Sequence, residues 1–176
     1  LASEKVFVSR DYHFNKVKTF HHMMDERTQE EPRAWDLEGA THRAGFKIEE
    51  LVEFVRAASP SEEDFDQALL QLHQALDKAA DKVAKKTPAQ QDLVGQVDAL
   101  IDTLYFTYGS FVLMGVDPER IFDIVHQANM GKIFPDGKAH FDPVTHKILK
   151  PDDWEEKYAP EPAIKKELQR QLKAYE

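Results

Sequence analysis

The chain contains no cysteine, no long apolar run and no excess of basic residues. Without cysteine it can form neither a disulfide nor a thiolate metal site. No apolar stretch approaches the roughly 18–20 residues of a membrane span, so we expect no association with a membrane. The first residues lack the apolar stretch of a secretory signal, which favours a cytoplasmic protein. The net charge of −9 argues against a nucleic-acid polymer as partner, because such partners require a basic surface.

Helical periodicity dominates the sequence. Its 176 residues, of which 41% are hydrophobic, suit a single domain over residues 1–176 with a sizeable core. From residue 132 to 162 there are five prolines, which indicates loops with a short hairpin around 139–148. We therefore predict an all-α fold, with a helical core over about residues 11–131 and a loop-rich tail and last helix over 132–176. The predicted helices cover about residues 11–26, 36–58, 62–86, 88–115, 119–131 and 163–175.

Residues that favour helix ends support these boundaries. Asp36 and Ser61 are suited to cap the second and third helices, because their side-chain oxygens can accept free backbone N–H groups. Thr87 followed by Pro88 predicts the start of the fourth helix, and Gly115 predicts its end.

Two acidic patches lie on two of the apolar helices. Glu49, Glu50 and Glu53 belong to the second predicted helix, and Asp98 and Asp102 to the fourth. A spacing of three or four residues places the acids of each patch on one helix face. Carboxylates on an apolar face are costly to bury without compensation, and Mg²⁺ prefers oxygen ligands of this kind. The pattern predicts a metal site; the alternative is a solvated helix edge.

Basic and amide side chains follow the fifth predicted helix. Asn129 and Lys132 are three residues apart, and Lys138 lies in the loop-rich segment after them. Lys132 could neutralise phosphate oxygens while Asn129 donates to a phosphate or a sugar. The alternative is that Lys132 only balances the dipole at the helix C-terminus, and that the later lysines only increase solubility.

Aromatic residues near the acidic patches offer surfaces for a base. Trp35 precedes the second helix and could stack on a nucleobase, although tryptophan more often packs in a core. Tyr105 continues the acidic line of the fourth helix. His21 ends the first helix beside a second histidine, and adjacent positions point to different faces, which makes a poor chelate. We include Trp35, Tyr105 and His21 among the candidate substrate-binding residues.

These motifs together resemble the all-α nucleoside triphosphate pyrophosphohydrolases, which include the MazG-like proteins, the dimeric dUTPases and the phosphoribosyl-ATP pyrophosphohydrolases. Glu50-Leu-Val-Glu53 is similar to the family's Glu-x-x-Glu motif. The stretch Asp102-Thr-Leu-Tyr105 resembles the later acidic helix, and Asn129-x-x-Lys132 resembles a segment of the phosphoribosyl-ATP branch. The likeness covers about residues 12–152. One departure is Ala99, which stands where the family has a glutamate; we expect Asp98, one position earlier, to replace it.

The resemblance implies an enzyme that hydrolyses a (deoxy)nucleoside triphosphate to the monophosphate and pyrophosphate. It implies two or three Mg²⁺ or Mn²⁺ ions held by Glu50, Glu53, Asp98 and Asp102, with Glu49 or Glu50 orienting the attacking water. Candidate substrates are dUTP, dCTP and dGTP, rather than phosphoribosyl-ATP. The family further implies a homodimer or homotetramer. The alternative function is a non-catalytic helical module that binds a metal or a protein partner.

Overall fold

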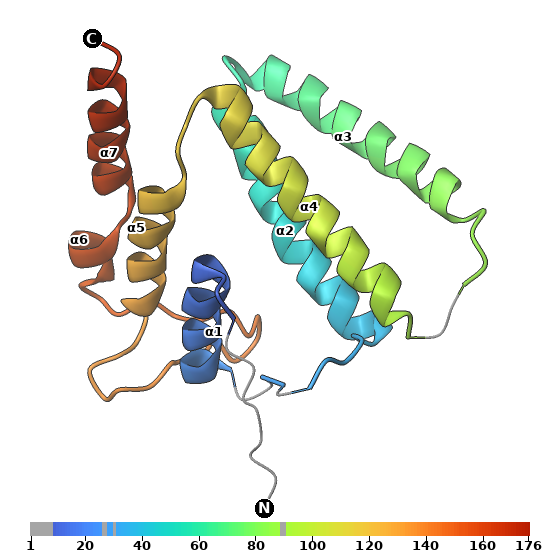
Figure 1. The fold of residues 1–176 in the computed structure, drawn as a ribbon, viewed down its shortest axis with the longest axis horizontal. Helices are drawn as coiled ribbons and strands as arrows, with labels where there is room; N and C mark the ends of the chain where they lie inside the picture. The colour runs from blue at the N-terminus through green and yellow to red at the C-terminus, as the bar shows by residue number, and fades with distance from the viewer. Residues whose placement is uncertain (1–8, 26–27, 30, 89–90) are drawn as a thin grey trace, which may run out of the picture. The chain divides into compact units, whose positions relative to one another are not determined.

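The structure is a computed structural model that describes residues 9–25, 28–29, 31–88 and 91–176. Within these residues it contains seven helices and no strand, apart from an isolated bridge between Phe141 and Ile148 (Figure 1). The predicted all-α fold class is confirmed. The helices are α1 Tyr12–Met24, α2 Leu37–Ala58, α3 Glu62–Val83, α4 Leu93–Met114, α5 Glu119–Met130, α6 Trp154–Tyr158 and α7 Glu161–Lys173.

The chain divides into two compact units. The first unit comprises residues 1–30 and 103–176, and the second comprises residues 31–102. The boundary lies inside α4, which contributes its first half to the second unit and its remainder to the first. The single domain expected from chain length stays a prediction.

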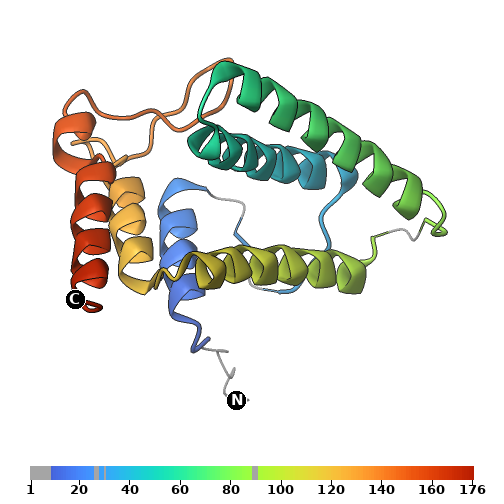
Figure 2. The ribbon, with the colours of Figure 1, turned by 90° about the horizontal axis from the view of Figure 1, so that it is seen from above.

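In the first unit, α5 packs between α1 and α7 (Figure 2). The buried apolar side chains of the described residues all belong to this unit: Met24 of α1, Ala128 of α5 and Trp154 of α6. The predicted start of α5 at residue 119 is confirmed, and the side chain of Asp117 accepts the backbone N–H of Glu119 at 3.0 Å. The core of this unit therefore takes residues from α1, α5 and α6.

In the second unit, α2 and α3 form a helical hairpin. Both of its predicted caps are confirmed. Asp36 accepts the N–H of Gly39 at 2.7 Å, and Ser61 accepts the N–H of Asp64 at 3.1 Å. No residue of α2, α3 or α4 is buried, although all three helices carry regular apolar residues. These three helices therefore form without the burial of an apolar face that normally stabilises a helix.

The predicted start of α4 at Thr87 and Pro88 is wrong. The helix begins at Leu93, and Asp92 caps it by accepting the N–H of Gly95 at 2.9 Å. The aspartate, a stronger cap than a threonine, lies nearer to the apolar run that continues as helix. Gly115 is confirmed as the end of α4, with a positive φ of 69° that favours glycine. The preceding helix α3 ends at Val83 instead of residue 86.

The first and last parts of the chain depart slightly from prediction. The first helix ends at Met24, and residue 26, to which we extended it, lies outside the described residues. The predicted loop contains the short helix α6, whose five residues are too few to show a period. The hairpin predicted around residues 139–148 is confirmed as a short turn, in which the backbone N–H of Asp142 donates to the carbonyl of Lys147 at 2.9 Å. None of the helices in the described residues combines the length and hydropathy needed to cross a membrane.

Candidate functional site

The four predicted metal ligands, together with Glu49, which is predicted to orient the attacking water, all lie in the second unit and are exposed. Glu49, Glu50 and Glu53 are on α2, and Asp98 and Asp102 are on α4. Their oxygen donors suit Mg²⁺ or Mn²⁺ chemically. Within the described part of the chain, however, no three His, Asp or Glu side chains are close enough to hold one cation. The metal site therefore stays a prediction.

The surroundings of Asp98 are apolar. The carboxylate borders an open hollow of about 410 Å³ on α4, whose other lining residues are Leu93, Val94, Val97 and Ile101. Val94 is 79% exposed and Ile101 is 57% exposed. Asp98 therefore stands among exposed apolar side chains of the same helix. That Asp98 takes the role of the family's glutamate, which is absent at Ala99, stays a prediction.

The predicted phosphate-binding pair is brought together at the end of α5. The ammonium of Lys132 donates to the side-chain oxygen of Asn129 at 2.8 Å, and both residues are half-buried. The backbone N–H of Lys132 also donates to the carbonyl of Asn129 at 3.1 Å. Lys138 lies in the following turn, where its backbone N–H donates to Asp136 at 3.0 Å and its side chain is exposed. A hydrogen-bonded Asn–Lys pair can present one cation and one amide to an anion.

Trp35 is held in place by α4 and by the start of α2. The side-chain amide of Gln96 pairs with both backbone groups of Trp35, and the indole covers Gly39, where an added Cβ would overlap the ring. The side chain of Trp35 is nevertheless 42% exposed. One part of the indole is therefore packed while another remains open to a ligand.

The remaining two predicted residues lie in the first unit. Tyr105 is 77% exposed on α4. His21 is half-buried on α1, with its Nδ1 4.0 Å from a carboxylate oxygen of Asp25. Their roles in substrate binding stay predictions.

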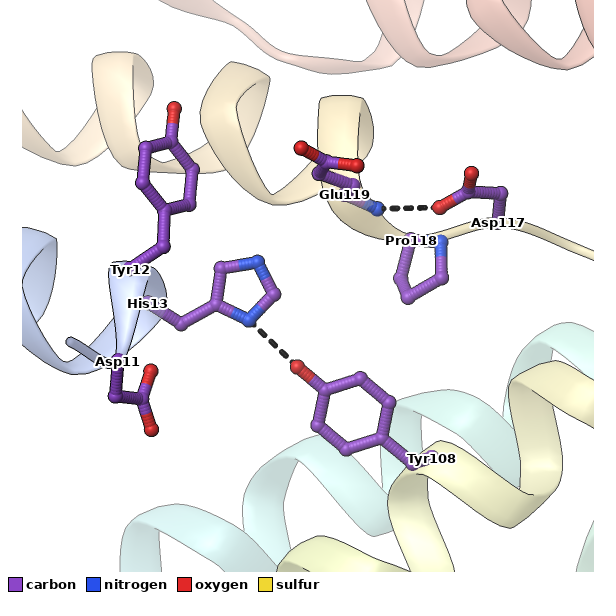
Figure 3. A pocket seen from close by; sticks show the side chains of 7 residues that line it. All are labelled: Asp11, Tyr12, His13, Tyr108, Asp117, Pro118 and Glu119. Carbon is purple, nitrogen blue, oxygen red and sulfur yellow. Dashed lines mark hydrogen bonds between the residues drawn. The ribbon is translucent and has the colours of Figure 1, made fainter.

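A pocket in the first unit was not predicted from the sequence. Its volume is about 330 Å³, and Figure 3 shows its lining residues: Asp11, Tyr12, His13, Tyr108, Asp117, Pro118 and Glu119. Tyr108 Oη lies 2.5 Å from Nδ1 of His13, whose ring stacks on Phe122 with centroids 4.0 Å apart. Burial, and secondly the charge of Asp11, raises the pKa of Tyr108, so its hydroxyl stays protonated at neutral pH. No sequence spacing could reveal this pocket, because its residues come from three separate segments.

Comparison with known proteins gives two matches. The model of the phosphoribosyl-ATP pyrophosphohydrolase family matches residues 17–129, more than half of the chain. Among solved structures, the chain is similar to a candidate NTP pyrophosphohydrolase from Exiguobacterium sp. 255-15, with 38% sequence identity and a TM-score of 0.86. That similarity covers 96% of this chain and 100% of the other. A comparison with curated proteins gives no match. The matched segment contains all five carboxylates and ends at Asn129, and the chain belongs to the phosphoribosyl-ATP pyrophosphohydrolase family.

Proposed function

We propose that this protein hydrolyses a (deoxy)nucleoside triphosphate to the monophosphate and pyrophosphate, with Mg²⁺ or Mn²⁺ as cofactor. The observation that carries the proposal is the family match over residues 17–129, which includes both acidic patches. The description of the Exiguobacterium protein as a candidate NTP pyrophosphohydrolase supports the same reaction. Candidate substrates are dUTP, dCTP and dGTP.

Each proposed ligand follows from its place on a helix. Glu50 and Glu53 occupy one side of α2, and Asp98 and Asp102 one side of α4, so each helix can offer two carboxylates to a cation. A bound divalent ion would supply charge neutralisation for the triphosphate and a more acidic water. Glu49 or Glu50 would orient the attacking water and accept its proton.

At the phosphate end, the proposed contacts are Lys132 and Asn129. Their mutual hydrogen bond of 2.8 Å fixes the ammonium beside the amide, so the charge is placed before a ligand arrives. Lys138, Tyr105 and His21 are further proposed contacts. Trp35 is proposed to stack on the base with the exposed part of its indole.

We further propose that the protein acts as a homodimer or homotetramer. Apolar side chains of α2 and α4 are widely exposed, among them Leu51 at 55%, Phe106 at 74% and Leu113 at 91%. A second copy, whose α2 and α4 have the same unburied apolar faces, is the partner that this surface fits.

One assay tests the proposed reaction. Purified protein is incubated with dUTP, dCTP, dGTP, the other nucleoside triphosphates and phosphoribosyl-ATP, in Mg²⁺, in Mn²⁺ and in a chelator. We expect equal release of pyrophosphate and monophosphate from at least one nucleoside triphosphate, abolished by the chelator. Release of inorganic phosphate alone would contradict the proposed bond cleavage. No release from any nucleotide would favour the alternative, a non-catalytic helical module.

A further inference from the structure

The C-terminal segment holds α5 at both ends. At the start of the helix, Gln171 of α7 pairs with the backbone of Asp117. Its Oε1 accepts the N–H of Asp117 at 3.0 Å, and its Nε2 donates to the carbonyl at 2.9 Å. At the end of the helix, the indole Nε1 of Trp154 donates to the carbonyl of Ala128 at 2.8 Å. Neither contact involves the side chains of Asn129 or Lys132, but both fix α5, the helix at whose end these two residues lie.

The contact between Trp154 and Ala128 completes the hydrogen bonding of the last helical turn. The last four carbonyls of a helix lack intrahelical partners and need others. Here Gln127 accepts from Gly131 at 2.9 Å, Asn129 from Lys132 at 3.1 Å and Met130 from Ile133 at 3.3 Å. The remaining carbonyl, that of buried Ala128, accepts from Trp154. The side chain of Trp154 thus satisfies the one carbonyl of this turn that the local backbone leaves open.

Trp154 is itself firmly held. It is 6% exposed, its backbone N–H donates to Pro151 at 2.9 Å, and the ammonium of Lys150 lies 4.0 Å from its ring centroid. From the other end of α6, the ring of Tyr158 covers Gly131, where an added Cβ would overlap it. The backbone between Asn129 and Lys132 is therefore enclosed by α6.

We propose that Trp154 is a positioning residue for the Asn129–Lys132 pair, acting through the carbonyl of Ala128. The proposal rests on the proposed function, in which Lys132 contacts the phosphates of a nucleotide. Without the indole N–H, the buried carbonyl of Ala128 has no donor, and the last turn must open to find water. Because Asn129 and Lys132 lie one and four residues after Ala128, their side chains lose their fixed place. Trp154 lies outside residues 17–129, so its contact with Ala128 is not part of the segment that the family model matches.

The first test is hydrogen exchange at the end of α5. Trp154→Phe keeps an aromatic ring and removes the donor. We expect the amides of Gly131, Lys132 and Ile133 to exchange about tenfold faster in this variant, with unchanged exchange in α3. The control is Tyr175→Phe, at a residue 87% exposed, which should leave all these rates unchanged. Unchanged exchange at the three amides in Trp154→Phe would overturn the proposal.

The second test is a double-mutant cycle in nucleotide hydrolysis. We expect Lys132→Ala to lower kcat/KM by about ten- to a hundredfold, and Trp154→Phe to raise KM by about three- to tenfold with little change in kcat. Lys166→Ala, an exposed lysine of α7, is the control for loss of a charge. If Trp154 acts through Lys132, Trp154→Phe should have no further effect in Lys132→Ala.

The outcomes separate the two proposals. A normal kcat/KM in Lys132→Ala would overturn the proposed role of Lys132, and the positioning role of Trp154 with it. A damaging Lys132→Ala combined with fully additive effects of the two substitutions would overturn the positioning role alone and leave the proposed function standing.

Discussion

The side-chain amide of Gln96 on α4 forms two hydrogen bonds with the backbone of Trp35. Its Oε1 accepts the N–H of Trp35 at 2.8 Å, and its Nε2 donates to the carbonyl at 3.0 Å. Gln96 precedes Asp98 by two residues, so the helix that carries a proposed metal ligand also sets the position of the proposed base-stacking residue. With both backbone groups paired, the exposed part of the indole is the part of Trp35 that a base can reach.

This contact predicts how Trp35 contributes to substrate binding. Trp35→Ala should raise KM by about tenfold, because stacking of a base on an aromatic ring is worth about 1–3 kcal/mol. Trp35→Phe retains a stacking surface and should raise KM by less than about threefold. Gln96→Ala should raise KM by an amount between these two, since it frees the backbone of Trp35 but keeps the indole ring. Steady-state kinetics on the preferred nucleotide measures all three, and an unchanged KM in Trp35→Ala would rule out stacking.

The acidic patches predict loss of turnover without loss of fold. Glu53→Gln and Asp102→Asn each remove a charged oxygen ligand, so we expect turnover to fall by at least about a hundredfold and Mg²⁺ binding to weaken. Circular dichroism should be unchanged, because both side chains are exposed. Glu63→Gln and Asp77→Asn, at exposed positions of α3, are the matched controls. Turnover at the wild-type rate in either test variant would contradict the ligand assignment.

Asp98→Asn tests the replacement of the missing glutamate separately. If Asp98 takes the place left open by Ala99, the variant should bind Mn²⁺ at least about tenfold more weakly, measured by titration calorimetry. Metal binding and turnover equal to wild type would mean that the site uses fewer carboxylates than we propose.

The unburied face of α4 predicts that a charge there disrupts the oligomer. Leu113→Glu places a carboxylate on apolar surface that we expect a second copy to cover, and burying an unpaired charge is costly. Sedimentation velocity should show dissociation or a loss of soluble protein. Val144→Glu, at a residue 83% exposed in a turn of the first unit, should leave the assembly intact. A wild-type protein that sediments as a monomer would contradict the proposed oligomer directly.

Glu167 predicts a loss of stability at low pH. Hydrogen bonds from Arg170, and secondly Gln171, lower the pKa of the Glu167 carboxyl from 4.5 to about 2. Between these values the unfolded chain binds a proton that the native chain does not, so the free energy of unfolding decreases as pH falls through this window. Glu167→Gln should weaken this dependence, and Glu161→Gln, an exposed acid of the same helix, should not. Urea unfolding at a fixed protein concentration, repeated from pH 4.5 to pH 2, measures the slopes; equal slopes in all three proteins would contradict the assignment.

Most helices could be predicted from the sequence because their signals are local. Asp36 and Ser61 cap α2 and α3 through hydrogen bonds to residues three positions later. The start of α4 was mispredicted because Thr87 and Pro88 form an acceptable start signal, and only the actual course of the chain showed that Asp92 serves instead. The helix α6 has five residues and depends on the burial of Trp154, which no local pattern encodes.

The sequence by itself determined the all-α fold class, the family motifs and the sides of α2 and α4 on which the acids lie. Helical hydrogen bonds and side-chain spacing depend on residues within about four positions of each other, so a linear pattern contains them. Only the tertiary structure decided that Gln96 holds Trp35, 61 positions away, and that Trp154 completes the last turn of α5 through Ala128, 26 positions away. The contact of Trp154 forms because the buried carbonyl of Ala128 requires a donor, and the folded chain brings that donor from a distant segment.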